Sequence, residues 1–93
     1  MHRGRDIIII MGHKQTIRKL KSRSNSITFS ELASLLESLG FHQDNKGRTS
    51  GSRVKFLNKN GVPIYLHKPH PRKTLLAYQV KEVVEILKEE NIL

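Results

Sequence analysis

The fold of this chain is decided by residues 53–67, which read RVKFLNKNGVPIYLH. Apolar and polar side chains alternate over residues 53–57 and 62–67, and a period of two is typical of β-strands with one buried face. The intervening residues 58–61 read NKNG, which is typical of a tight hairpin turn. Pro63 stands near the start of the second strand, where a missing amide hydrogen is tolerated. The segment therefore predicts an antiparallel β-hairpin.

The same alternation assigns the hairpin side chains to the two faces of a sheet. The set that we expect to face the core consists of Val54, Phe56, Ile64 and Leu66. The set that we expect on the opposite face consists of Arg53, Lys55, Tyr65 and His67. One face of the sheet is thus predicted to be apolar, and the other to carry two cations, a phenol and an imidazole.

Helices are predicted on both sides of the hairpin in the sequence. Residues 29–39 follow Thr28, which forms a capping-box pair with Glu31, and they precede Gly40, a residue typical of helix ends. Residues 76–90 form the second predicted helix. The two apolar stripes have helical spacing and consist of Leu32, Leu35, Leu36 and Leu39 in the first helix, and of Val80, Val83, Val84 and Leu87 in the second.

A weaker strand is predicted over residues 41–43, so the element order is helix, strand, strand, strand, helix. Both amphipathic helices need an apolar surface, and the sheet offers only one. We therefore expect an α+β two-layer sandwich with a three-stranded antiparallel sheet and both helices on one face. The other face of the sheet is left open to water.

Length and composition narrow the possible functions. The 93 residues suffice for one small domain, and the absence of cysteine excludes a disulfide framework, a Cys-ligated zinc site and thiol catalysis. The longest apolar run, residues 7–11, is too short to span a bilayer, so we expect no membrane partner and a cytoplasmic protein. Lys and Arg outnumber Asp and Glu by 17 to 8, and the net charge of +9 favours nucleic acid as the partner.

Positive charge is concentrated near the N-terminus. Residues 1–26 hold seven basic residues and one acidic residue, Asp6, which accounts for +6 of the net charge of +9. Residues 19–26 read KLKSRSNS and offer little to bury, so we expect a basic flexible tail over residues 1–26 and a folded domain over residues 27–93. The candidate roles of the tail are an arm that attracts RNA, a solvated leader, an extension upstream of an internal start at Met11, or a remnant of an expression vector.

The open sheet face has two interpretations. It is either a solvated polar surface or a platform that contacts phosphates, to which Arg72 and Lys73 of the following loop add charge. His67 and His70 have the spacing of a metal-ligand pair, but the two residues between them are not helical and no third ligand is evident. We therefore expect no metal and no cofactor, and we consider either histidine a candidate for proton transfer.

Several of these segments together resemble the HicA family, the small ribonuclease toxins of HicA–HicB toxin–antitoxin pairs. In chain order they are the leucine-rich first helix ending in Leu39-Gly-Phe41, then Lys46-Gly47, Gly51-Ser-Arg-Val-Lys-Phe56, the hairpin, His67-Lys-Pro-His-Pro71, Leu75 and a valine-rich last helix. The resemblance covers about residues 28–92. It implies a fold similar to the double-stranded-RNA-binding domain, metal-independent cleavage of mRNA, and neutralisation by a HicB antitoxin that covers the active face.

The chain departs from the family at one position that matters for catalysis. Family members usually carry a catalytic histidine just after a Gly-Ser pair, whereas Gly51-Ser52 is here followed by Arg53, which cannot act as a base near neutral pH. The family's other recurrent histidine is matched by either His70 or His67, with Arg72 in place of the usual glycine. The predicted catalytic residues are His70, His67 and Arg53, and the predicted RNA-binding residues are Lys55, Tyr65, Lys68, Arg72 and Lys73.

Three functions are compatible with this set of residues. The first is the toxin component of a type II toxin–antitoxin system, a metal-independent endoribonuclease that cleaves mRNA and is neutralised by a HicB-type antitoxin. The alternative is a non-catalytic RNA-binding module on the same fold, for which the arginine at position 53 is the main support. The third is a protein-interaction role, in which the basic face mainly docks an acidic antitoxin.

Overall fold

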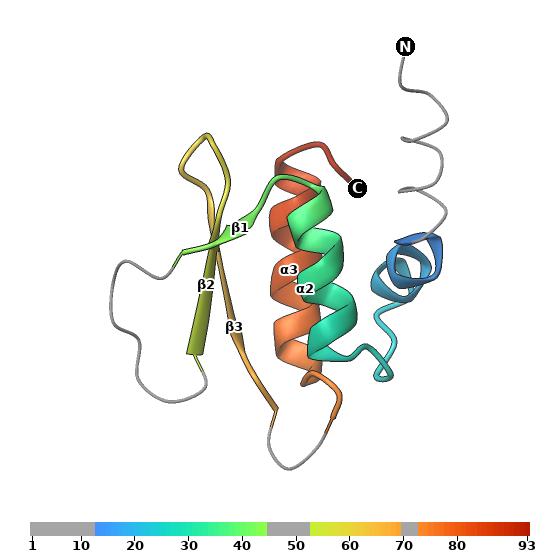
Figure 1. The fold of residues 1–93 in the computed structure, drawn as a ribbon. Helices are drawn as coiled ribbons and strands as arrows, with labels where there is room; N and C mark the ends of the chain where they lie inside the picture. Colours follow the sequence, from blue (N-terminus) through green and yellow to red (C-terminus); the bar gives the residue numbers. More distant parts are fainter. Residues whose placement is uncertain (1–12, 45–52, 70–72) are drawn as a thin grey trace.

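The computed structural model describes residues 13–44, 53–69 and 73–93 (Figure 1). Its elements are a helix of residues 13–21, then α2 (Phe29–Ser38), β1 (His42–Gln43), β2 (Arg53–Leu57), β3 (Pro63–His67) and α3 (Ala77–Glu89). From α2 onward this is the predicted order of helix, strand, strand, strand, helix. Within the described ranges, no helix is long and apolar enough to cross a membrane.

The sheet has the strand order β1-β2-β3, and both of its strand pairs are antiparallel. β2 and β3 pair along their whole length, from Arg53 opposite His67 to Leu57 opposite Pro63. In Figure 1, α2 and α3 lie side by side against one face of this sheet. The predicted α+β sandwich is confirmed, and the opposite sheet face is left without a covering helix among the described elements.

Burial confirms the predicted alternation of the hairpin. Val54 retains 7% of its surface, and the other three core-facing residues retain at most 1%. They share one core with both helices, whose buried apolar residues are Leu32, Leu35, Leu36, Val80, Val83, Val84 and Leu87. Burying two amphipathic stripes and one sheet face against each other is the main source of stability for a domain of this size.

The end of α2 follows the sequence prediction. The helix has its C-cap at Leu39, and Gly40 then adopts a positive φ of 91°. The amide of Gly40 donates a hydrogen bond to the carbonyl of Glu37 (3.1 Å), and the amide of Phe41 donates to that of Leu36 (2.8 Å). These two bonds form a Schellman motif, which satisfies carbonyls that the helix end would otherwise leave unpaired.

The other two helices end in the same way without glycine. Arg23, after residues 13–21, has a φ of 53°, and Asn91, after α3, has a φ of 61°. The following amides donate back into each helix, from Ser24 to the carbonyl of Lys19 (2.9 Å) and from Ile92 to that of Leu87 (2.8 Å). These two endings lacked the glycine signal by which a sequence usually reveals such a motif.

The N-terminal segment differs from the sequence prediction. We expected a basic flexible tail over residues 1–26, but residues 13–21 are helical and Leu20 is completely buried. Ile17 packs against the same core, and Thr16 is buried beside it. The prediction was wrong for residues 13–26 because two apolar side chains one helical turn apart are enough to seat a short helix, although the segment is otherwise polar. Residues 1–12 lie outside the described ranges.

The helix of residues 13–21 covers the side of the α2–α3 pair that faces away from the sheet (Figure 1). Lys19 connects it to the start of α2, because its Nζ lies 3.0 Å from Oε2 of Glu31 and 3.3 Å from the carbonyl oxygen of Ser26. The Glu31 carboxylate also accepts the backbone amide of Thr28 (2.9 Å), which completes the predicted capping box. The described chain therefore has one more layer than the predicted sandwich.

Candidate nucleic-acid interface

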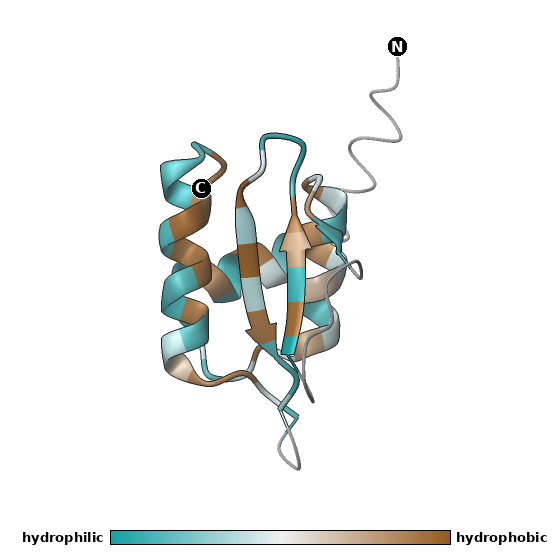
Figure 2. Cartoon of the chain, turned by 90° about the vertical axis from the view of Figure 1, so that its left-hand side faces the viewer, coloured by the Kyte–Doolittle hydropathy of each residue, from teal (hydrophilic) through white to brown (hydrophobic). Residues whose placement is uncertain are grey.

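The predicted polar residues of the hairpin are brought together on the uncovered face of the sheet. The register pairs Arg53 directly with His67 and Lys55 directly with Tyr65. Directly opposed residues project to the same face, so the four side chains form two adjacent cross-strand pairs. Figure 2 looks onto this face and shows polar and apolar residues alternating along β2 and β3. We call these four residues the open face.

Tyr65 is the centre of the open face. Its side chain is 44% exposed, and the Arg53 guanidinium carbon lies 5.0 Å from the centroid of its ring. The Lys55 Nζ lies 5.9 Å from the same centroid. Cations at these distances are attracted by the negative potential of an aromatic face. Two cations therefore lie beside a flat aromatic ring. This combination suits a nucleic-acid strand, because the cations can contact phosphates and the ring can stack on a base.

An acidic residue that sequence reasoning did not connect with this face also contacts it. The Oδ2 of Asp44 lies 3.6 Å from the Nζ of Lys55, and the Asp44 amide donates a hydrogen bond to the Lys55 carbonyl (2.8 Å). The contact arises because β1 pairs with β2, so the residue after β1 lies beside the middle of β2. Asp44 therefore partly neutralises the charge of Lys55 on the open face.

His67 is exposed and occupies the last position of β3. Its carbonyl oxygen accepts a hydrogen bond from Nε2 of Gln79 (3.4 Å), a residue of α3 that is itself buried. The Oε1 of the same amide accepts the backbone amide of Leu76 (3.4 Å). Gln79 thus ties the end of β3 to the start of α3 and fixes the backbone from which the imidazole projects.

The remaining predicted site residues do not all join the open face. The Nζ of Lys68 lies 5.5 Å from the ring centroid of Phe29, the first residue of α2, so this cation lies on the helix side of the sheet. Lys73 is exposed in the loop before α3. His70 and Arg72 lie outside the described residues, so their predicted roles stay predictions.

Another histidine lies apart from these residues. His42 Nδ1 is 2.7 Å from Oε1 of Glu37, and Oε2 of the same carboxylate accepts the Gln43 amide (3.1 Å). The hydrogen bond from His42, followed by that from the Gln43 amide, holds the pKa of the Glu37 carboxyl below its ordinary value. This group fastens β1 to the last turn of α2, which indicates a structural role for His42.

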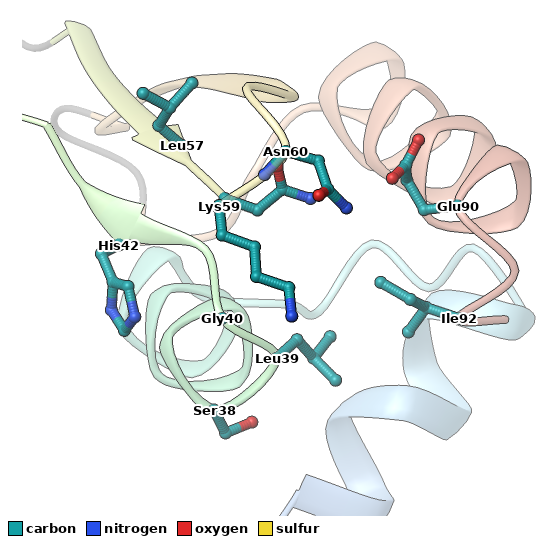
Figure 3. A pocket seen from close by; sticks show the side chains of 10 residues that line it. Ser38, Leu39, Gly40, His42, Leu57, Lys59, Asn60, Glu90 and Ile92 are labelled. Atoms are coloured by element: carbon teal, nitrogen blue, oxygen red, sulfur yellow. The ribbon is translucent and has the colours of Figure 1, made fainter.

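A groove lies at the hairpin-turn end of the domain (Figure 3). It is lined by Ser38, Leu39, Gly40, His42, Leu57, Asn58, Lys59, Asn60, Glu90 and Ile92. Arg53 begins β2 and His67 ends β3, so both lie at the opposite end of the hairpin from its turn. The groove contains none of the predicted site residues.

The described residues contain no group of three or more His, Cys, Asp or Glu side chains that could hold a metal ion. The open face itself offers a guanidinium, an ammonium, a phenol and an imidazole. Arg53 can stabilise negative charge on a phosphate, and the imidazole of His67 is a candidate for proton transfer.

Comparison with protein families matches residues 29–90 to the family described as HicA toxin of bacterial toxin-antitoxin. The matched segment runs from the start of α2 to the end of α3 and covers two thirds of the 93 residues. The helix of residues 13–21 precedes it. Comparisons with curated proteins and with solved structures gave no significant match.

Proposed function

The chain belongs to the HicA toxin family of bacterial toxin–antitoxin systems, and on that premise we propose that it is a metal-independent endoribonuclease that cleaves mRNA. The observation that carries the proposal is the pairing of Arg53 with His67 on the open face. A cation that stabilises the phosphorane charge and a group that transfers a proton are both needed to cleave RNA without a metal ion, and here they occupy adjacent positions.

The proposed reaction uses the ribose 2′-hydroxyl of the substrate as the nucleophile. A base removes the 2′-hydroxyl proton, the 2′-oxygen forms a bond to phosphorus, and the bond from phosphorus to the 5′-oxygen breaks. An acid gives a proton to the departing 5′-oxygen, so the products are a 2′,3′-cyclic phosphate and a 5′-hydroxyl. His67 and His70 are the candidates for the two proton transfers, which are typically worth about 10²–10⁴-fold each. Arg53 stabilises the negative charge that develops on the phosphorane oxygens.

In this proposal the other residues of the open face bind the RNA strand. Lys55 contacts phosphate, and Tyr65 provides a surface on which a base or ribose can stack. Lys73 and Arg72 add positive charge in the loop that follows β3. Lys68, whose Nζ lies beside Phe29 on the helix side of the sheet, adds to the positive field without joining the open face. Contacts of this kind recognise the backbone and the 2′-hydroxyl more than the base sequence, so cleavage should be weakly sequence-selective and strongly salt-dependent.

The test is cleavage of a labelled RNA in the presence of EDTA. Wild type, His67→Ala and His70→Ala are compared, with His42→Ala as the matched control because His42 pairs with Glu37 away from the open face. We expect the control to cleave as wild type does, at least one of the other variants to lose about 100-fold or more, and the product to carry a 2′,3′-cyclic phosphate. If His67→Ala and His70→Ala both cleave at the wild-type rate, the assignment of the histidines is wrong.

We further propose that a HicB-type antitoxin neutralises the protein by covering the open face, and that the pair acts in the cytoplasm, where mRNA is available. An antitoxin bound there would compete with RNA for Arg53 and Lys55. Coexpression with the adjacent reading frame should restore growth and yield a copurifying complex. An Arg53→Glu, Lys55→Glu variant that still binds this partner with wild-type affinity would place the antitoxin elsewhere.

A non-catalytic RNA-binding role is the second candidate, because Arg53 occupies the position at which the family usually carries a histidine. In that case the protein binds RNA in a salt-sensitive manner and cleaves it at no pH. The EDTA experiment, repeated between pH 5 and 9, distinguishes the two candidates.

A further inference from the structure

The helix of residues 13–21 presents a second basic surface. Its core-facing side carries Thr16, Ile17 and Leu20, which are buried or partly buried. Lys14, Arg18 and Lys21 are all exposed and occupy positions i, i+4 and i+7 of the same helix. At about 100° per residue, these three cations fall within an arc of about 60°, so they form one stripe along the helix. We call them the basic stripe.

Among the residues that the structure describes, none of the three cations of the basic stripe forms an ion pair. The sequence from 13 to 30 contains no Asp or Glu. Within residues 13–44, 53–69 and 73–93, the ion pair formed by this helix is that of Lys19, whose position on the opposite flank brings it to Glu31. The other ion pairs found there join His42 to Glu37 and Lys55 to Asp44. No acidic side chain of the described residues therefore pairs with the basic stripe.

The stripe has dimensions that fit a phosphate backbone. At a rise of about 1.5 Å per residue, the distance along the helix axis from Lys14 to Lys21 is about 10.5 Å. One strand of a duplex carries a phosphate about every 3.4 Å along its axis, so the stripe matches about three consecutive phosphates. Arg23, which is exposed just after the C-terminal end of this helix, extends the positive charge beyond Lys21.

The location of the stripe separates it from the open face. The helix of residues 13–21 lies on the side of the α2–α3 pair that faces away from the sheet (Figure 1). A protein that covers the open face would leave the helix uncovered, because the two helices and their core stand between them. The buried Leu20 and the bond between Lys19 and Glu31 fix the orientation of the stripe relative to the domain.

We propose that the basic stripe of Lys14, Arg18 and Lys21 is a second binding surface, which contacts the phosphate backbone of nucleic acid independently of the open face. Its function is to hold the protein on a polyanion while the open face is free for cleavage or occupied by a partner. The proposal goes beyond ribonuclease activity and does not require it.

The test is binding of a fluorescent oligonucleotide as a function of salt concentration. A 2′-O-methyl RNA and a DNA duplex are used, because neither offers the 2′-hydroxyl needed for cleavage. The Lys14→Gln, Arg18→Gln, Lys21→Gln variant is compared with a matched control, Lys59→Gln, Lys81→Gln, Lys88→Gln, which removes three exposed cations from other parts of the surface. Circular dichroism and thermal unfolding of both triple variants verify that they fold.

The stripe variant should lose affinity for the RNA analogue, and the slope of log K against log salt should fall by about 2, since each phosphate contact on a single strand contributes about 0.7. The control variant should retain the wild-type slope. If the stripe variant loses binding to the 2′-O-methyl RNA but not to the DNA duplex, the surface is specific for RNA. If it loses binding to both equally, the surface recognises the phosphate backbone that the two share.

Two results would overturn the proposal. Equal losses in the stripe and control variants would show that only net charge matters. Unchanged oligonucleotide binding by the stripe variant, with lost binding to vesicles of phosphatidylserine and phosphatidylcholine, would show that the surface serves a membrane instead. Because the oligonucleotides cannot be cleaved, a wild-type protein that fails to cut RNA leaves this inference standing and removes only the proposed nuclease activity.

Discussion

Arg53 and His67 are direct antiparallel partners across β2 and β3, and both residues are exposed. α2 and α3 cover the other face of the sheet (Figure 1). Directly opposed residues of such a pair have Cβ atoms about 4.5–5.5 Å apart, so a guanidinium and an imidazole can reach the same phosphate. Arg53 occupies the position after Gly51-Ser52 at which the family usually carries a histidine. Charge stabilisation, rather than proton transfer, is the role that chemistry allows at this position.

Arg53→Gln should lower the single-turnover rate of RNA cleavage at saturating protein by about 100-fold, because one donor to the developing phosphorane charge is removed. Arg53→Lys should retain part of the rate, since it keeps the charge and loses the planar fork. The rate is measured on a labelled RNA in EDTA at fixed ionic strength.

The matched control for Arg53 is Lys59→Gln, which removes an exposed cation from the hairpin turn at the other end of β2. This variant should cleave within a factor of about 2 of wild type, allowing for weaker long-range attraction of RNA. An equal effect of both substitutions would mean that Arg53 acts only through the net charge of the protein.

Glu31 makes the stability of the domain dependent on pH. The hydrogen bond from the Thr28 backbone amide is the largest influence on this carboxyl, and together with Lys19 it outweighs burial and holds the pKa below the ordinary value of 4.5. A carboxyl whose pKa is lowered in the folded state contributes stability that is present above the unfolded pKa and is lost as pH falls through the folded pKa. Glu31→Gln keeps a residue that can complete the capping box but removes the charge.

The free energy of unfolding of wild type and Glu31→Gln should therefore differ by a constant amount above about pH 5, and the difference should shrink as pH falls below 4.5. Urea denaturation at several pH values between 3 and 7 measures it. Glu82→Gln, an exposed substitution on α3, serves as the reference. A difference that stays constant down to pH 3 would show that the Glu31 charge does not stabilise the fold.

Leu20 provides a test of whether the N-terminal helix belongs to the folded domain. Leu20→Ala should lower the free energy of unfolding by at least about 2 kcal/mol, because a completely buried side chain is truncated. Leu76→Ala, at a position that is 41% exposed, should cost clearly less. Equal costs in urea denaturation would mean that residues 13–21 are not held against the core in solution.

The sequence predicts correctly those parts of the fold in which apolar residues recur with a regular spacing. The hairpin can bury all of its large apolar side chains on only one face, and these are Val54, Phe56, Ile64 and Leu66. The location of Arg53 and His67 on the other face follows from this. The family resemblance agreed with this fold, but the parity of the hairpin already determined the open face.

The parts that the sequence does not predict depend on contacts between distant segments. The helix of residues 13–21 has only two apolar side chains, and its stability comes from packing on α2 and α3 rather than from its own pattern. Asp44 reaches Lys55 only because β1 lies beside β2. Lys68 follows directly after β3, and its Nζ lies near the ring of Phe29 instead of joining the open face.

The residues that follow two of the helices give two predictions, one of lower and one of higher stability of the domain. Gly40 has a φ of 91°, so Gly40→Ala should cost about 1 kcal/mol, although a methyl group would meet no atom within 4 Å. Arg23 already occupies the left-handed region at a φ of 53°, so Arg23→Gly should stabilise the domain by about 0.5 kcal/mol through relief of the same strain. Thermal unfolding should show a midpoint lowered by about 4–8 °C for the first variant and raised by about half as much for the second. Destabilisation by Arg23→Gly would mean that the arginine side chain contributes more to the folded state than its backbone strain costs.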